Sequence, residues 1–123
     1  MQYENVAIPL GFAWSSPFVR WQGSLAEVSS TELAAAVTTR ALADRHLDPD
    51  ELAGLVLGWS VPQIDIFYGA PTLAGRIGAP GITGPMISQA CATSVASIHA
   101  AAGSVQGGAG TQLVVATDRT SNG

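Results

Sequence analysis

Short apolar runs separated by helical patterns set the organisation of this chain. Four of these runs read as buried strands, near residues 6–10, 55–58, 86–90 and 113–116. Strands that are apolar throughout and alternate with helices are typical of a parallel sheet that is covered on both faces. The pattern therefore predicts an α/β fold with four parallel strands.

Two helix starts carry capping signals. Ser29 stands three residues before Glu32, so the serine side chain can cap the helix while the glutamate reaches back. Asp48 and Glu51 repeat this spacing, with Pro49 at the first helical position. We expect a long helix after Ser29 and one short turn after Asp48.

Two further helices are expected in the second half of the chain. The first lies near residues 70–77, and a connector rich in glycine and proline follows over residues 78–85. The second covers residues 91–105, consists mostly of small residues, and ends at Gly107 and Gly108.

The composition indicates a surface that is covered by something else. A chain of 123 residues is one domain or less, and only 11% of its residues are charged, against about 25% in an ordinary soluble domain. Its hydrophobic content of 47% is too high for extended disorder. We therefore expect part of the surface to be buried against a partner or against further chain.

Charge and motif content exclude several function classes. The net charge is −4 and the five basic residues, all arginines, are scattered, so nucleic-acid binding is not expected. The single cysteine cannot form an internal disulfide, and neither a secretory signal, a membrane span, a phosphate-binding loop nor a metal-ligand cluster is visible. A cytoplasmic protein is the default expectation.

Cys91 is the residue with the clearest chemical potential. It stands where a predicted strand turns into a predicted helix, and the free N–H groups and dipole of a helix start favour the thiolate. Small residues follow it and leave room for a substrate. A lone cysteine is also often an inert part of the core. Position alone leaves both readings open.

The other polar and aromatic candidates have structural interpretations. His99 lies eight residues after Cys91, about 12 Å along a helix, and therefore cannot activate the thiol locally. We interpret it as a residue packed or capped by neighbours on the helix face, and His46 as the end of the first long helix. The three tryptophans are expected to serve packing or an interface, and these are Trp14, Trp21 and Trp59.

The order of these segments resembles the N-terminal part of the thiolase superfamily. Residues 88–102 are similar to the nucleophile segment, in which a strand leads to Cys and a helix of small residues. Gly107-Gly108, the apolar run 113–116 and an acidic–Ser turn over residues 118–121 follow as in that family. Other matching segments lie upstream, and these are Ser16-Pro17-Phe18, Gly23-Ser24-Leu25, Asp48-Pro49 and residues 55–58.

This resemblance implies a layered, thiolase-like half-fold over residues 1–123, which would be incomplete without further chain. It implies that Cys91 is the catalytic nucleophile and forms a thioester with an acyl group. The reaction would be thiolysis of a 3-ketoacyl thioester by coenzyme A, or a Claisen condensation. The coenzyme A thioester would be a substrate, and no separate cofactor or metal is expected. A homodimer or homotetramer is implied as well.

Several departures from the family pattern leave the function open. Ser15 replaces the usual Arg, Ser94 the usual Gly and Asp118 the usual Glu. The His, Asn and second Cys motifs that complete the family's active site do not occur in this sequence. A second chain, or a continuation of this one, would have to supply them across an interface above ~1,000 Å². The alternative is a non-catalytic, thiolase-like subunit with a structural or interaction role.

Overall fold

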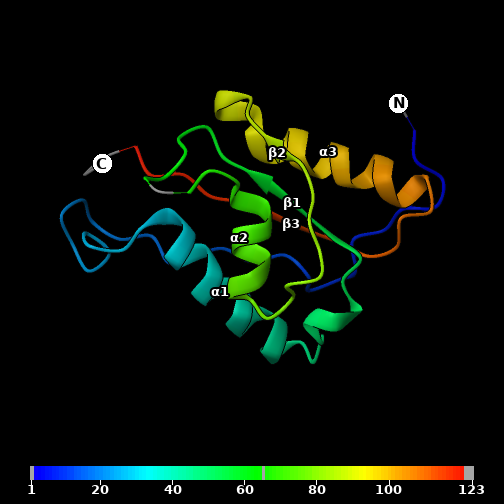
Figure 1. The fold of residues 1–123 in the computed structure, drawn as a ribbon, viewed down its shortest axis with the longest axis horizontal. Helices are drawn as coiled ribbons and strands as arrows, with labels where there is room; N and C mark the ends of the chain where they lie inside the picture. Colours follow the sequence, from blue (N-terminus) through cyan, green and yellow to red (C-terminus); the bar gives the residue numbers. More distant parts are fainter. Residues whose placement is uncertain (1, 65, 121–123) are drawn as a thin grey trace.

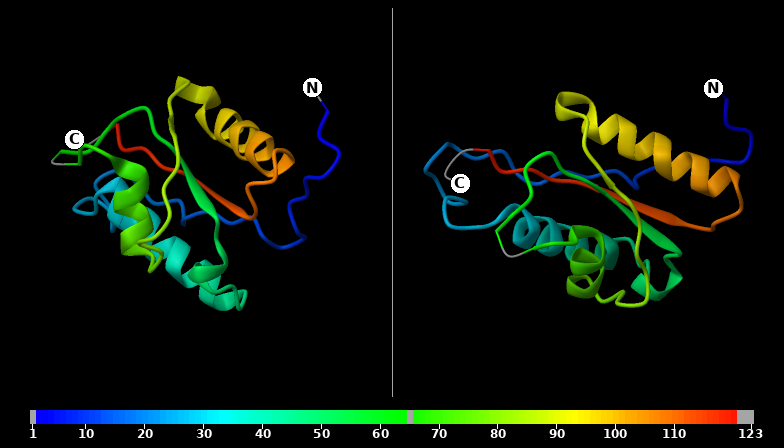
Figure 2. Two further views of the ribbon diagram at one scale, coloured as in Figure 1. Left: turned by 45° about the vertical axis from the view of Figure 1, so that its right-hand side comes forward. Right: turned by 45° about the horizontal axis from the view of Figure 1, so that its top comes forward.

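A three-layer α/β arrangement appears in the computed structural model, which describes residues 2–64 and 66–120 (Figure 1). The sheet has three parallel strands in the order β2-β1-β3. Helix α3 covers one face, and α1 and α2 cover the other (Figure 2). The bounds of the elements are α1 Ser30–Asp44, β1 Gly54–Gly58, α2 Gly69–Arg76, β2 Met86–Ile87, α3 Thr93–Gln106 and β3 Gln112–Ala116, with single helical turns at Pro49–Glu51 and Ala90–Ala92. The α/β prediction is confirmed.

Strand β2 is shorter than the sequence indicated, since it ends at Ile87 rather than near residue 90. Its partner β1 ends at Gly58, which stands opposite Ile87, so the chain beyond has nothing to pair with. The chain before β2 already runs beside β1, since the Pro85 carbonyl accepts from Leu57 N–H. Pro85 itself has no N–H, so it cannot donate a hydrogen bond to the ladder. The ladder therefore narrows to two residues.

The predicted first strand, residues 6–10, is wrong. This segment is irregular, and the side chains of Ile8 and Leu10 are 65% and 102% exposed. Pro9 cannot donate to a ladder, and its carbonyl accepts a turn bond from Phe12 N–H. Apolar content alone did not distinguish this exposed segment from a buried strand.

Helix α1 begins with the predicted capping box. The Ser29 hydroxyl accepts from Glu32 N–H at 3.2 Å, and Glu32 accepts from Ser29 N–H at 3.0 Å. Hydrogen bonds from Ser29, first of all from its backbone N–H, hold the pKa of Glu32 below its ordinary value of 4.5. The ionised carboxylate therefore stabilises the folded state fully above pH 4.5, and this stabilisation is lost as the pH falls through the lowered pKa.

Replacing Ser29 with alanine is expected to lower the free energy of unfolding by about 1 kcal/mol, because an early helix N–H loses its cap. Ser29→Thr is the matched control, since it keeps a hydroxyl at the same position. Urea denaturation of both variants measures the difference. Equal midpoints for the alanine and threonine variants would show that the cap contributes nothing.

The core lies mainly between the sheet and the helices α1 and α2. Leu55 and Leu57 of β1 are fully buried and join a cluster with Leu73 of α2 and Leu42 of α1. Full burial of a leucine contributes roughly 1.5–3 kcal/mol. This cluster fixes the sheet and, through β1, the position of the strand ends.

Helix α3 approaches the sheet closely because small residues face each other. A Cβ at Gly58 would lie 2.6 Å from the Ser97 Oγ and 3.0 Å from the Thr93 Cγ2. Both α3 residues are buried, and the Ser97 hydroxyl donates back to the Thr93 carbonyl at 2.8 Å. Glycine in β1 therefore lets the start of α3 rest against the end of the strand.

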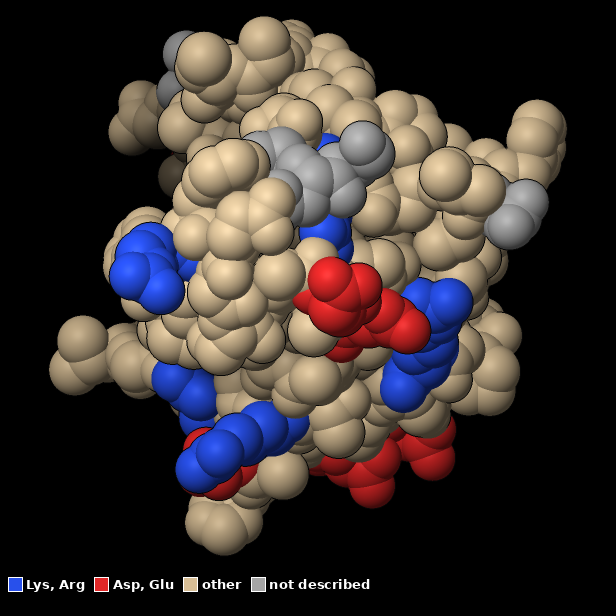
Figure 3. Space-filling model, turned by 90° about the vertical axis from the view of Figure 1, so that its left-hand side faces the viewer, with Lys and Arg blue, Asp and Glu red and all other residues tan. Residues whose placement is uncertain are grey.

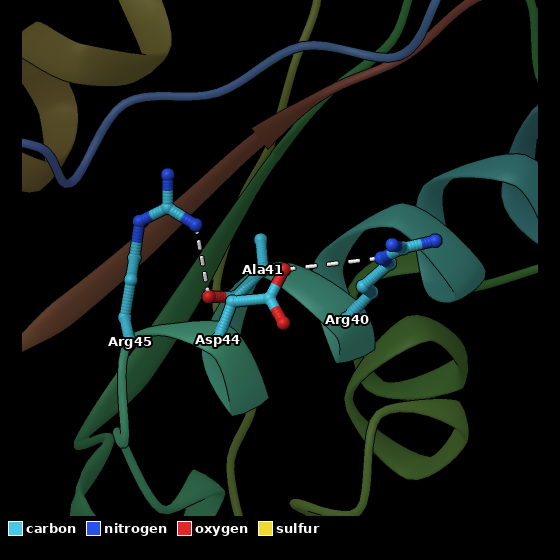
Figure 4. Close-up of polar contacts among 4 residues, drawn as sticks. All are labelled: Arg40, Ala41, Asp44 and Arg45. Atoms are coloured by element: carbon cyan, nitrogen blue, oxygen red, sulfur yellow. Dashed lines mark hydrogen bonds and ion pairs between the residues drawn. The ribbon is translucent and has the colours of Figure 1, made fainter.

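Polar contacts at the end of α1 tie the N-terminal segment to the fold. Arg45 donates to the Ala41 carbonyl at 3.0 Å (Figure 4). It also donates to the Gly11 carbonyl at 2.7 Å, and its guanidinium lies 4.8 Å from the Trp14 ring centroid. The exposed Arg40–Asp44 pair, at 3.8 Å, contributes little to stability. Arg45 is thus the main polar link between this segment and α1.

The surface carries apolar side chains that an isolated domain usually buries. Leu10, Phe18 and Phe67 are almost wholly exposed. On the face in Figure 3 the charged side chains form a few separate groups on a largely uncharged surface. No described helix has the length and apolar character required to cross a bilayer.

Candidate active site

Cys91 lies between a strand and a helix, as predicted, but in the helical turn Ala90–Ala92, and α3 begins at Thr93 rather than at Cys91. Its side chain is exposed and lines a hollow of about 230 Å³. The lining is small and polar, and consists of Gly58, Ala90, Cys91, Thr93, Ser94, Ala116, Thr117 and Asp118. The thiol is therefore accessible rather than part of the core.

The hollow lies at the carboxyl ends of two neighbouring parallel strands. Gly58 ends β1 and Ala116 ends β3, and the two residues stand opposite each other in the ladder. Strand β1 lies between the other two strands. The chain runs from β1 to β2 on one edge of β1, and then through α3 to β3 on the opposite edge. In open α/β sheets, ligands bind at the carboxyl edge where the connections diverge in this way.

The turn that carries Cys91 has an unusual backbone. Ala90 has a φ of +47°, in the left-handed region that residues with a side chain seldom adopt. Ala92 N–H donates to the Gln89 carbonyl at 2.9 Å, which closes the turn. Such strained residues persist only where the surrounding structure holds them, and they cluster at functional sites.

Thr93 supplies that support from the first position of α3. Its hydroxyl donates to the Ala90 carbonyl at 2.7 Å and accepts from Gln89 N–H at 2.8 Å. It also contacts the Ser60 hydroxyl at 3.1 Å, and the threonine is 5% exposed. One buried hydroxyl, at the residue that follows the cysteine turn, thus joins the start of that turn to the loop after β1.

Asp118, which follows β3, is bound to the same loop. Its carboxylate accepts from Ser60 N–H at 2.8 and 3.0 Å and from Val61 N–H at 2.8 Å. Hydrogen bonds to a carboxylate are about twice as strong as neutral ones. The sequence placed Asp118 in an acidic–Ser turn, of which Ser121 lies outside the described residues.

Neither histidine lines the hollow. The Tyr3 hydroxyl lies 2.6 Å from His99 Nδ1 and donates to the His99 carbonyl, so His99 is packed by a neighbour as expected. His46 follows the end of α1 with a φ of +54°, and its N–H donates to the Ala43 carbonyl. It closes the helix through its backbone.

None of the three tryptophans lines the Cys91 hollow. Trp59 is buried and Trp14 half-buried, whereas Trp21 is 66% exposed. Trp21 and Asp118 line a second hollow, of about 270 Å³, which contains no thiol. The described residues hold no group of three or more His, Cys, Asp or Glu side chains that could bind a metal.

The sequence singled out Cys91 as the candidate nucleophile, but it gave no indication of Ser60 or of the contacts of Thr93. A hydroxyl two residues after the cysteine was read as a small side chain that leaves space. The position of Thr93 near a helix start could have indicated this role, because threonine side chains there often bond to nearby backbone groups. The contact with Ser60 joins residues 33 positions apart, and no local pattern predicts it.

The exposure of Cys91 leads to a labelling prediction. We expect a thiol reagent such as 5,5′-dithiobis(2-nitrobenzoate) to react with one group per folded chain, because the sequence holds one cysteine. The release of thionitrobenzoate with and without denaturant measures this. Reaction only after unfolding would show that the thiol is buried.

Comparisons with protein families and with individual proteins agree with one another. The family model described as "Thiolase, N-terminal domain" matches residues 12–117. The mycobacterial beta-ketoacyl-[acyl-carrier-protein] synthase III of Mycobacterium tuberculosis H37Rv is 32% identical over 94 residues. That match covers 76% of this chain and 28% of the relative, so the chain spans less than a third of the relative's length.

Solved structures show the same fold. The acetyl-CoA acetyltransferase of Bacillus anthracis has a TM-score of 0.68 at 29% identity, covering 80% of this chain and 25% of that one. The 3-oxoacyl-[acyl-carrier-protein] synthase III of Aquifex aeolicus has a TM-score of 0.68 at 25% identity, covering 75% and 30%. The acetyl-CoA acetyltransferase of Syntrophomonas wolfei, at 23% identity and a TM-score of 0.73 over 80% and 26%, supports the fold. With the family model matching residues 12–117, this chain belongs to the thiolase N-terminal domain family.

Proposed function

We propose that this chain carries the acyl-accepting cysteine of a thiolase-type acyltransferase. The observation that supports this most strongly is the exposed Cys91 thiol in a hollow at the carboxyl edge of the sheet. The small residues around it leave space for a thioester carbonyl. The Bacillus anthracis and Aquifex aeolicus relatives, named as an acetyltransferase and a synthase of acyl thioesters, are consistent with that chemistry.

In the proposed first step, the Cys91 sulfur attacks the carbonyl carbon of an acyl-coenzyme A. The bond from that carbon to the coenzyme A sulfur breaks, and the proton from Cys91 ends on the released coenzyme A thiol. In the second step the acyl group passes to coenzyme A or to a carbanion. Two such transfers replace one harder step, which is the benefit of covalent catalysis.

The negative charge that develops on the carbonyl oxygen needs hydrogen-bond donors. At the cysteine turn, Ala92 N–H and Thr93 N–H already donate to the carbonyls of Gln89 and Ala90. We assign the Cys91 N–H to the oxyanion, because it belongs to the residue that carries the attacking sulfur. A second donor would come from outside these residues.

We further propose that a second chain, or further residues of this one, complete the site. The His, Asn and second Cys motifs of the family would provide the acid/base and oxyanion groups. The exposed apolar side chains, such as Phe18 and Phe67, support an interface, since their removal from water on association is favourable. The reaction would be 3-ketoacyl-coenzyme A thiolysis or a Claisen condensation.

Incubation with acetyl-coenzyme A tests the proposal. We expect a mass increase of one acetyl group, mapped to Cys91 by peptide mass spectrometry, and none with coenzyme A alone. The experiment is run on this chain alone and with any chain that co-purifies. No adduct in either preparation would favour the alternative, a thiolase-like subunit with a structural role.

A further inference from the structure

We propose that Asp118, Ser60 and Thr93 form a hydrogen-bonded chain that positions Cys91 for acyl transfer. The inference rests on the proposed function, because it concerns the geometry around the same thiol. These three residues are positioning residues, since they act on the backbone of the Cys91 turn. They come from the loops after β3 and β1 and from the start of α3.

The hydrogen-bonding capacity of Thr93 fixes the direction of the chain. A threonine hydroxyl has one proton to donate and two lone pairs to accept with. Its proton goes to the Ala90 carbonyl at 2.7 Å, and one lone pair accepts from Gln89 N–H at 2.8 Å. Ser60 must therefore be the donor in its 3.1 Å contact with Thr93. The hydroxyl of Thr93 is then fully used.

Asp118 forms the other end of this hydrogen-bonded chain. Its carboxylate binds the consecutive N–H groups of Ser60 and Val61, which holds the backbone that carries the Ser60 hydroxyl. Asp118 directly follows the loop residue Thr117, whose N–H donates to the Gly58 carbonyl at 2.9 Å. The ends of β1 and β3 are thereby locked together beneath the cysteine turn.

The hydrogen-bonded chain supports a strained residue next to the nucleophile. Ala90 holds a left-handed conformation, with a φ of +47°, immediately before Cys91. The Thr93 hydroxyl binds Gln89 N–H and the Ala90 carbonyl, so its two backbone partners stand on either side of the Gln89–Ala90 peptide bond. Loss of the hydroxyl releases both contacts, and the turn can relax toward an ordinary conformation.

Relaxation of the turn would move the sulfur relative to the hollow that receives the thioester. A displacement of about 1 Å of a reacting group can lower a rate by roughly 100-fold. A small alkylating reagent has no fixed orientation at the site, so its reaction with an exposed thiol depends little on this placement. The ratio of acylation rate to alkylation rate therefore reports position rather than exposure.

The test compares Thr93→Val, which keeps the shape of the side chain without the hydroxyl, with Thr93→Ser, which keeps the hydroxyl. Ser104→Ala is the matched control, because Ser104 makes a similar hydroxyl-to-carbonyl bond in α3, to Ala100, away from the hollow. Acylation by acetyl-coenzyme A and alkylation by iodoacetamide are followed by mass spectrometry. We expect Thr93→Val to lower the ratio by roughly 10- to 100-fold, and Thr93→Ser and Ser104→Ala to stay within about threefold.

An unchanged ratio in Thr93→Val, or an equal loss in Thr93→Ser, overturns the positioning role. If Thr93→Val does not fold, Ser60→Ala and Ser60→Thr decide by the same criterion, since only the first removes the donor to Thr93. If the wild type accepts no acyl group, the proposed function fails separately. The positional claim is then decided by hydrogen exchange of the Ala92 and Thr93 amides. Faster exchange in Thr93→Val but not in Thr93→Ser supports it, and equal rates overturn it.

Discussion

Replacement of Cys91 by serine is expected to lower the rate of acyl uptake from acetyl-coenzyme A by at least about 1,000-fold. The hydroxyl is a far weaker nucleophile at neutral pH than a thiolate, so the covalent step becomes much slower. The substitution keeps the size of the side chain, and Cys91 is exposed. The free energy of unfolding should therefore change by no more than about 0.5 kcal/mol.

The measurement is the mass of the intact chain after a time course with acetyl-coenzyme A. Ser104→Ala provides the control, because it alters α3 without altering the hollow. An adduct that forms in Cys91→Ser at the wild-type rate and maps by peptide mass spectrometry to a position other than 91 would remove the assignment of Cys91 as the nucleophile.

Gly84→Ala is expected to lower the free energy of unfolding by about 3 kcal/mol or more, the upper end for overpacking. A Cβ at this position would lie 1.8 Å from the Leu55 carbonyl oxygen. Leu55 N–H donates to the Thr83 carbonyl, so the chain around Gly84 lies directly against β1. The methyl group would have to push the connector away from the central strand.

Gly75→Ala is the matched control and should move stability in the opposite direction. Gly75 lies within α2, and a Cβ there would meet no atom within 4 Å. Alanine stabilises a helix interior by roughly 0.5–1 kcal/mol relative to glycine. Urea denaturation of both variants gives the comparison. A Gly84→Ala variant as stable as the wild type would mean that residues 83–85 are not packed against β1.

The local elements of this protein follow from short-range rules that the sequence states directly. Ser29 with Glu32, and Asp48 with Glu51, satisfy the first N–H groups of a helix within four residues, so tertiary contacts are not needed to define those starts. The apolar run over residues 55–58 predicted a buried strand, and the structure has β1 there, over Gly54–Gly58. The position of Cys91 before a helix of small residues was predictable for the same reason.

The tertiary structure decided which apolar segments find a partner. Residues 6–10 have the apolar composition of a strand, and β2 was predicted to continue to residue 90, but pairing depends on where β1 ends and on the prolines at positions 9 and 85. Close approaches such as Gly84 against Leu55 depend on the path of the chain in space.

The setting of the thiol was likewise decided by tertiary structure. The chain from Asp118 through Ser60 to Thr93 joins three segments that are 58 and 33 residues apart in sequence. Hydroxyl and carboxylate groups such as these have many possible partners in an extended chain. Only the meeting of the carboxyl ends of β1 and β3 with the start of α3 selects the partners that hold Cys91.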